Sequence, residues 1–303
     1  MLRGIDEFRP RFTEQGIAIH TPEVVQMLSE DELVALVPRF DGWIIGDDPA
    51  TGRVFEAGRS GRLRAAVKWG VGVDNVDFVA AKRLGLPIAN TPHMFGAEVA
   101  DVALGYVIAL ARELVAIDRG VRAGGWPKPA GISLASKTVA LVGYGDIGRH
   151  LARRLVAAEM RVIAYDPVLR EPPADAALAQ WPERLEEADF IVFTCALTPE
   201  NRHMLDGRVL ARARRGVRIV NVARGPLIDE AALAEGLAAG QVRSAALDVF
   251  EVEPLPVNSP LRQFDQCVFG SHNASNTVDA VRRTSERAIK LLLNFLGVLA
   301  GAP

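Results

Sequence analysis

A glycine-rich turn between a strand-like run and a helical stretch constrains the fold of this chain more than any other feature. The residues from Thr138 to Asp166 read as strand, turn, helix and second strand, and the turn, GYGDIG, fits the pattern G-x-G-x-x-G. Gly143 permits a tight turn, Gly145 lets the backbone approach a pyrophosphate, and Gly148 lets helix and strand pack closely. Such a pattern alone often marks an ordinary turn, but in this context it predicts a dinucleotide-binding βαβ unit.

The end of the second strand predicts which dinucleotide binds. The helix after the turn directs its free N–H groups and its positive dipole end at a pyrophosphate. Asp166 ends the next strand, where a carboxylate can accept hydrogen bonds from both ribose hydroxyls. The same carboxylate would repel a 2′-phosphate. We therefore expect NAD rather than NADP as the cofactor, although Arg170 could offset part of the repulsion.

Length and composition indicate a soluble protein of two domains. The chain has 303 residues, of which 49% are hydrophobic and 24% charged, and its formal net charge is −2. No global positive charge favours nucleic acid or anionic lipid. The two isolated cysteines, Cys195 and Cys267, indicate a reducing compartment and neither a metal site nor a disulfide. Without a signal pattern or a membrane-spanning apolar stretch, we expect a cytoplasmic protein.

Strand-like runs alternate with helical stretches on both sides of the turn, which is typical of parallel α/β sheets. The first such helix, Ser29 to Val37, carries a capping box of Ser29 and Glu32. We expect two doubly wound parallel-sheet domains: a Rossmann NAD-binding domain, residues 93–276, inserted into a smaller flavodoxin-like substrate domain, residues 1–92 and 277–303. Besides the two strands of the βαβ unit, the expected strands are 17–22, 42–46, 64–69, 87–91, 190–195, 217–222, 245–249 and 266–270.

Two longer helices are expected at the borders of the nucleotide domain. Glu98 to Ala123 form one helical pattern without proline, and its centre, VALGYVIALA, is apolar nearly all round. Such a helix should be buried, against another domain or a second subunit. The last helix, Thr277 to Leu299, is amphipathic and should return to pack on the first domain.

Three segments after the turn place polar residues at the ends of strand-like runs, where ligands bind in open α/β sheets. They carry Arg224, the two glutamates Glu251 and Glu253, and His272. Taken alone, such an arginine more often forms a surface ion pair, such a glutamate is more often a solvated loop residue, and such a histidine more often has its hydrogen bonds satisfied at the end of a strand. Beside a dinucleotide turn, together they fit the reduction of a 2-oxo acid. Histidine moves the hydroxyl proton, a carboxylate stabilises the imidazolium, and arginine binds the substrate carboxylate. The residues alone do not decide between the two glutamates.

These motifs resemble those of the D-isomer-specific 2-hydroxyacid dehydrogenase family, and most of all its D-3-phosphoglycerate dehydrogenase branch. The resemblance implies an NAD-dependent oxidoreductase with His272 as acid/base, Glu253 rather than Glu251 as its partner, and Arg224 as substrate clamp. It also implies a homodimer formed through the region of the long helix. The matching segments, which cover nearly the whole chain, are KWGVGVDNVD (68–77), NTP (90–92), GYGDIG (143–148), YDP (165–167), VARG (222–225), LDVFEVEP (247–254) and GSHNAS (270–275).

The glycines of the first matching segment predict an anion site, because paired glycines after a strand expose successive backbone N–H groups. By resemblance, Val71 and Gly72 bind the substrate carboxylate, and Lys68 lies near a distal phosphate or carboxylate. A plain glycine turn is the alternative. Besides the three glycines of the turn, the cofactor contacts implied by resemblance are Thr91, Asp146, Ile147, Asp166, Ala196, Val222, Ala223, Arg224 and Asp248.

The chain departs from the family pattern at three places. Ala196 stands where relatives usually carry proline, and Asn201 lies near the position of a usual threonine, so cofactor affinity could differ. Relatives also begin with a strand that the opening residues, MLRGIDEFRP, do not resemble. In a flavodoxin-like order that strand lies between two others. We therefore expect either unpaired backbone groups in the small domain or a start further upstream.

The resemblance favours interconversion of 3-phosphoglycerate and 3-phosphohydroxypyruvate, with hydroxypyruvate or glyoxylate reduction as the alternative. A second alternative is a protein that binds and senses NAD(H) without turnover. The presence of all three catalytic residue types argues against it. A formate-oxidising relative would carry glutamine in place of Glu253.

Overall fold

The computed structural model describes residues 4–24 and 27–298 and separates into two compact units. Unit 1 comprises Met1–Met94 and Thr277–Pro303, and unit 2 comprises Phe95–Asn276. Each unit has its own parallel sheet with helices, which confirms the expected α/β fold class. None of the helices in the described part of the chain is both long and apolar enough to cross a membrane.

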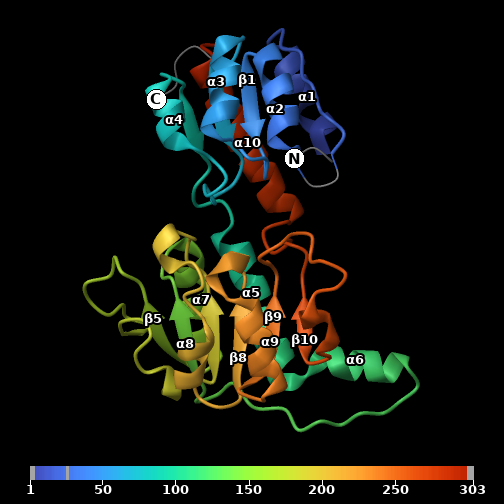
Figure 1. The fold of residues 1–303 in the computed structure, drawn as a ribbon, viewed down its shortest axis with the longest axis vertical. Coiled ribbons are helices and arrows are strands. Elements are labelled where there is room, and N and C mark those ends of the chain that lie inside the picture. Colours follow the sequence, from blue (N-terminus) through green and yellow to red (C-terminus); the bar gives the residue numbers. More distant parts are fainter. Residues whose placement is uncertain (1–3, 25–26, 299–303) are drawn as a thin grey trace. The chain divides into compact units, whose positions relative to one another are not determined.

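Unit 2 is built on a seven-stranded parallel sheet in the order β10-β9-β8-β7-β4-β5-β6 (Figure 1). The order reverses beside β4, so the sheet is doubly wound and its switch point lies between β4 and β7, where ligands bind in such folds. The strands are β4 Thr138–Val142, β5 Arg161–Tyr165, β6 Ala177–Leu178, β7 Phe190–Phe193, β8 Val217–Asn221, β9 Val242–Leu247 and β10 Cys267–Phe269.

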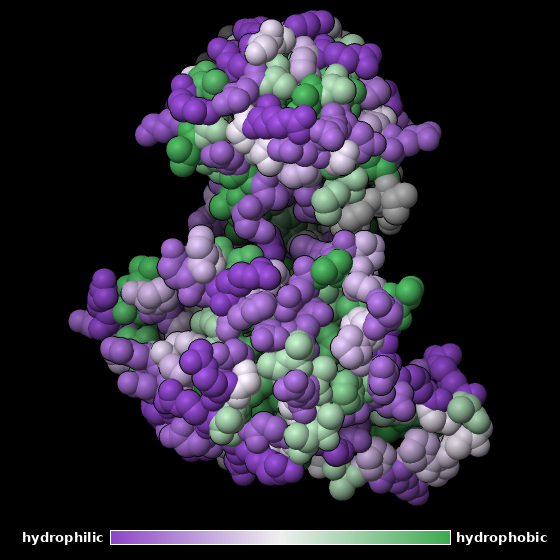
Figure 2. Space-filling model, in the orientation of Figure 1, coloured by the Kyte–Doolittle hydropathy of each residue, from purple (hydrophilic) through white to green (hydrophobic). Residues whose placement is uncertain are grey.

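Helices cover both faces of this sheet, and the two central strands β4 and β7 are fully buried (Figure 1). On the face of unit 2 that Figure 2 shows, polar side chains predominate and apolar ones lie in small scattered groups. The helices are α5 Gly96–Arg112, α6 Leu114–Arg122, α7 Asp146–Ala157, α8 Gly207–Arg212 and α9 Glu230–Ala238, and the short 3-10 helices are η3 Leu185–Glu187, η4 Pro199–Asn201, η5 Gly225–Leu227 and η6 Pro260–Gln263.

The single helix expected over 98–123 is wrong, because the structure breaks it into α5 and α6. Glu113 adopts a left-handed conformation, with φ 53° and ψ 35°, which ends the hydrogen-bond ladder of α5. One face of α5, which includes Val99, Val107 and Leu110, is buried within unit 2 itself, and the helix packs against α7 and the strands β8 and β9, whereas Ile108 is exposed. By contrast α6 projects from the body of unit 2 (Figure 1) and has no buried residue. The subunit contact stays a prediction.

Unit 1 has three parallel strands in chain order, β1 Gly42–Ile45, β2 Ala65–Lys68 and β3 Ile88–Asn90. The capping box of Ser29 and Glu32 is confirmed at the start of the second helix. The last helix packs on β1 and β2, so the end of the chain completes the core of this unit, as expected. The helices are α1 Ile5–Thr13, α2 Glu30–Leu36, α3 Gly52–Ser60, α4 Phe78–Arg83 and α10 Val278–Phe295, with the 3-10 helix η2 Val37–Arg39.

The strand expected at 17–22 is wrong, because residues 17–22 have no regular secondary structure. Among the described residues β1 pairs only with β2, so no strand lies where this run could pair. Its apolar side chains, Ile17 and Ile19, pack instead against a cluster formed by α1 and α10. A run with strand-like composition forms a strand only where a neighbour offers hydrogen bonds.

Candidate active site

The carboxyl ends of the strands of unit 2 gather most of the predicted site residues at one edge of the sheet. Because all seven strands are parallel, the residues that follow them lie at the same edge. Gly143 follows β4, Asp166 follows β5, and Ala196 lies three residues after β7. The segment Val222 to Arg224 follows β8, Asp248 follows β9, and His272 lies three residues after β10. Nucleotide-turn and acid/base residues therefore share this edge.

The glycine turn has the geometry that a pyrophosphate requires. Gly143 has φ 95°, and Asp146 begins α7, so the first free N–H groups of this helix face the turn. A Cβ placed on Gly145 would meet no atom within 4 Å, so the space over this residue is open. A Cβ on Gly148 would lie 2.2 Å from the carbonyl oxygen of Gly143, so helix and turn are in direct contact there. The residues present thus fit a dinucleotide.

The Asp166 carboxylate lies directly beside this turn. Its Oδ2 atom accepts a hydrogen bond from the backbone N–H of Tyr144 at 2.8 Å, and its Oδ1 atom accepts one from Val168 at 2.9 Å. A carboxylate oxygen has two acceptor sites, so each oxygen can still accept a ribose hydroxyl. Two backbone hydrogen bonds hold the orientation of this side chain before a nucleotide binds.

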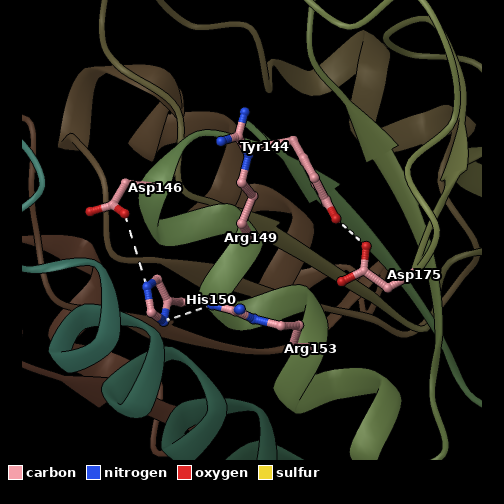
Figure 3. A pocket seen from close by; sticks show the side chains of 6 residues that line it. All are labelled: Tyr144, Asp146, Arg149, His150, Arg153 and Asp175. Atoms are coloured by element: carbon pink, nitrogen blue, oxygen red, sulfur yellow. Dashed lines mark hydrogen bonds and ion pairs between the residues drawn. The ribbon is translucent and has the colours of Figure 1, made fainter.

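A pocket of about 270 Å³ opens next to the turn, lined by Tyr144, Asp146, Arg149, His150, Arg153 and Asp175 (Figure 3). The Tyr144 hydroxyl donates to Asp175, which fastens the segment after β5 to the turn. Burial, followed by this hydrogen bond, raises the pKa of Tyr144 to about 12. None of the three expected catalytic residues lines this pocket. The residues that line this pocket therefore stabilise the turn, and the predicted proton-transfer residues lie elsewhere.

The two departures from the family pattern near β7 contact each other. The side-chain amide of Asn201 donates to the carbonyl oxygen of Ala196 at 2.8 Å, and its Oδ1 accepts from the backbone N–H of Thr198 at 2.7 Å. Asn201 thus stabilises the loop that carries Ala196. Cys195 lies under the turn, and burial raises the pKa of its thiol to about 12.

His272 and Glu253 form a direct pair at the other end of the same sheet edge. The Nδ1 atom of His272 lies 2.7 Å from the Oε2 atom of Glu253. The Oε1 atom of Glu253 accepts a hydrogen bond from the backbone N–H of Phe250 at 3.0 Å. Both side chains keep some exposure, 33% for the histidine and 22% for the glutamate. Because Nδ1 contacts the carboxylate, Nε2 is the ring nitrogen that can exchange a proton with a substrate.

The charge state of Glu253 suits this pairing. Burial raises the pKa of its carboxyl, but the hydrogen bond and charge of His272, the Phe250 N–H and the charge of Arg224 outweigh burial and hold the pKa below its usual value. Glu253 therefore stays ionised at neutral pH and favours the protonated imidazole. The backbone of Arg224 is held by the side-chain amide of Asn221, which donates to its carbonyl oxygen at 2.9 Å.

Asp248 holds the His272 loop, a role that sequence reasoning missed. Its carboxylate accepts from the backbone N–H groups of Asn273 at 3.1 Å and Ala274 at 2.9 Å, and its carbonyl oxygen accepts from the N–H of His272 at 2.6 Å. Burial, then the charge and hydrogen bond of Asp248, raise the pKa of Tyr106 to about 12. The sequence signal for the contact between Tyr106 and Asp248 is a polar hydroxyl in the otherwise apolar centre of α5, which requires a hydrogen-bond partner.

In unit 1, the structure places the predicted anion loop after β2. The Thr91 hydroxyl, which is fully buried, accepts from the N–H of Gly70 at 2.8 Å and fixes the start of the loop. Among the described residues, no acceptor takes the N–H groups of Val71 and Gly72. Two successive unbonded amides can bind a carboxylate. Thr91 is thus hydrogen-bonded to the anion loop. Its predicted contact with the cofactor stays a prediction.

Lys68 is buried and already bonded within unit 1. The residue is only 4% exposed, and its Nζ donates to the carbonyl oxygen of Gly46. The same atom lies 3.6 Å from a carboxylate oxygen of Asp47. The ammonium group therefore stabilises the loop after β1.

Comparison with known proteins agrees with this geometry. The family model of the D-isomer specific 2-hydroxyacid dehydrogenase, NAD binding domain, matches residues 104–274, more than half of the chain. The chain belongs to the D-isomer-specific 2-hydroxyacid dehydrogenase family. It is therefore an oxidoreductase with an NAD-binding domain, as the sequence predicted.

Similar members of this family differ in the substrate that their names give. The chain is 35% identical to a hydroxypyruvate reductase of Thermotoga maritima over 89% of this chain and 90% of that protein. It is 36% identical to D-3-phosphoglycerate dehydrogenase 3 of Arabidopsis thaliana over 90% of this chain but only 47% of that protein. The chain thus spans about half the length of this relative. The TT0316 protein of Thermus thermophilus superposes with a TM-score of 0.88 and 31% identity, covering 97% and 94% of the two chains.

The open space over Gly145 and the contact under Gly148 give a paired prediction. Gly145→Ala should fold with an unchanged Tm but bind NADH at least tenfold more weakly, because the new methyl group occupies pyrophosphate space. Gly148→Ala should lower the Tm as well, because its methyl group overlaps the Gly143 carbonyl. Thermal unfolding and NADH fluorescence titration measure both. Equal loss of Tm in the two variants would contradict the assignment of Gly145 to the pyrophosphate site and of Gly148 to the packing of helix and turn.

The pairing of Glu253 with His272 predicts a pH effect. Replacing Glu253 by glutamine removes the charge that favours the imidazolium, so the pKa that limits 2-oxo acid reduction at high pH should fall by about one unit. Reduction needs the protonated histidine, so activity should be lost at a lower pH than in the wild type. Plots of kcat against pH measure this. Glu186→Gln, an exposed glutamate of the same unit, is the control and should leave the profile in place.

Proposed function

We propose that the protein is an NAD-dependent reductase of small 2-oxo acids without a phosphate, such as hydroxypyruvate or glyoxylate, which become the corresponding 2-hydroxy acids. The observation that carries the proposal is the His272–Glu253 contact at the sheet edge that also holds the glycine turn. The position of Arg224 directly after β8, at the same edge, supports it further.

The residues of unit 2 account for proton transfer and binding of the acid. Bound NADH supplies the hydride for the carbonyl carbon. His272 gives its Nε2 proton to the carbonyl oxygen, while Glu253 on Nδ1 stabilises the imidazolium. Arg224 binds the substrate carboxylate through its planar guanidinium group. In the reverse reaction the same histidine removes the hydroxyl proton.

Unit 1 supports the choice of a small acid. The unbonded N–H groups of Val71 and Gly72 suit a carboxylate. Lys68, the residue that resemblance connects with a distal phosphate, is buried and bonded to Gly46 and Asp47. A lysine in that state does not offer its charge to a phosphate without breaking these contacts. For this reason we propose hydroxypyruvate and glyoxylate as better substrates than 3-phosphohydroxypyruvate. The family resemblance alone favoured the opposite order.

A substrate panel tests this function. Purified protein with NADH should reduce hydroxypyruvate or glyoxylate with a higher kcat/KM than 3-phosphohydroxypyruvate. His272→Ala should lower kcat at least 100-fold because the proton donor is lost, whereas His20→Ala, an exposed histidine of unit 1, should not. Faster turnover of the phosphorylated acid would contradict the substrate proposal. Tight NADH binding without turnover of any 2-oxo acid would instead identify a nucleotide sensor.

The fixed Asp166 carboxylate supports NAD over NADP. A carboxylate held beside the glycine turn would repel the 2′-phosphate of a bound NADPH, so NADH should bind more tightly than NADPH. Asp166→Ala should narrow the ratio of the two dissociation constants by about tenfold. Asp175→Asn is the control, because its carboxylate is bonded to the Tyr144 side chain. A ratio that stays the same in Asp166→Ala would remove this residue from the ribose site.

A further inference from the structure

Two glutamates outside the proposed mechanism hold each other's backbone. The N–H of Glu230 donates to the Oε1 atom of Glu251 at 3.0 Å, and the N–H of Glu251 donates to the Oε1 atom of Glu230 at 2.7 Å. Glu230 begins α9, and Glu251 lies two residues before Glu253. The reciprocal pair therefore fastens the segment that carries the partner of His272 to the start of a helix. Hydrogen bonds to ionised carboxylates are among the stronger ones in proteins.

A second histidine lies close to this pair, although its buried Nε2 atom makes no hydrogen bond within the described part of the chain. The Nε2 atom of His203 lies 3.1 Å from the Oε1 atom of Glu251, and an Nη atom of Arg202 lies 3.9 Å from its Oε2 atom. His203 has φ 53°, and its backbone N–H donates to the carbonyl oxygen of Pro226 at 2.7 Å. The histidine is thus held by the segment that follows Arg224. Unit 2 therefore contains two histidine–glutamate pairs whose glutamates are two residues apart.

The backbone that follows Arg224 also contacts the glutamate segment directly. A Cβ placed on Gly225 would lie 1.8 Å from the carbonyl carbon of Phe250 and 2.3 Å from the nitrogen of Glu251. No side chain fits between these two backbones. Residues 250–253, which we call the 250–253 segment, are therefore packed against Gly225 on one side and tied to the start of α9 on the other.

Three carboxylates and several basic side chains lie around the pair. Burial is the main reason that the pKa of Glu230 is raised, and the charges of Glu251 and Glu253 add to it, while the hydrogen bond from the Glu251 backbone opposes it. Facing these three carboxylates are His203 and Arg202, beside Glu251, and His272 and Arg224, which lower the pKa of Glu253.

We propose that Glu230 and Glu251 are positioning residues, which fix the 250–253 segment and so hold the Glu253 carboxylate on Nδ1 of His272. This rests on the acid/base role proposed above for His272. Glu253 reaches the histidine from a segment that the reciprocal hydrogen bonds of Glu230 and Glu251 tie to the start of α9. Loss of that tie lets the carboxylate move away from Nδ1. The imidazolium is then less stabilised, and a displacement of about 1 Å costs up to about 100-fold in rate.

Alanine and glutamine variants test this role. Glu230→Ala and Glu251→Ala should each lower kcat for hydroxypyruvate reduction at least tenfold and lower the pKa of the high-pH limb. The double variant should be no worse than the single ones, because both act through one contact. Glu230→Gln keeps the acceptor oxygen for the Glu251 N–H and should retain most of the rate. The dissociation constant of NADH should not change, because the glycine turn lies at other strands of the sheet.

The control is Glu235→Gln, an exposed glutamate on the same helix, which should behave as the wild type. If kcat of the alanine variants falls only with Tm and their pH profile overlays that of the wild type, the positioning role is wrong. An equal loss in Glu230→Gln and Glu230→Ala would also overturn it. Full activity in His272→Ala would instead remove the proposed function, and with it this inference. An inactive His272→Ala beside unchanged Glu230→Ala would remove the inference alone.

Discussion

The parallel direction of the seven strands in unit 2 is the constraint on which the rest of its site depends. Hydrogen bonds between parallel strands fix the register, so residues that follow different strands end at one edge whatever their distance in the chain. The strands β4, β5 and β7 bring the nucleotide turn and Asp166 to this edge. The strands β8, β9 and β10 bring Arg224, Asp248 and His272 to it. The sheet thus brings the loops to one edge, and local hydrogen bonds such as those of Asp248 then fix the loop that carries His272.

Much of the sheet could be predicted from the sequence because buried runs bounded by turn residues have little choice of structure. The runs at 42–46, 64–69 and 217–222 all appear as strands with nearly the expected bounds. The run at 17–22 looked equally suitable, yet a strand also requires a partner, and composition does not show one. Likewise the break at Glu113 arises from one left-handed residue inside an otherwise helical pattern, where the surrounding residues carry no glycine or proline signal.

Within the site, the sequence could predict the residue types that chemistry requires but not the contacts between distant residues. It left Glu251 and Glu253 as alternatives until resemblance favoured one. The structure shows that each glutamate contacts a different histidine, Glu253 with His272 and Glu251 with His203. The Asp248–Tyr106 contact, the Thr91–Gly70 hydrogen bond and the burial of Lys68 likewise depend on elements far apart in the chain. No local sequence pattern indicates contacts of this kind.

The division of the chain assigns separate tasks to separate stretches of its gene. The nucleotide turn and the proton-transfer pair are both encoded within one uninterrupted stretch, Phe95–Asn276, whereas the amides of Val71 and Gly72 come from an earlier one. If Val71 and Gly72 bind the substrate carboxylate as proposed, changes in the earlier stretch would alter which acids are accepted and leave the residues proposed for redox chemistry unchanged.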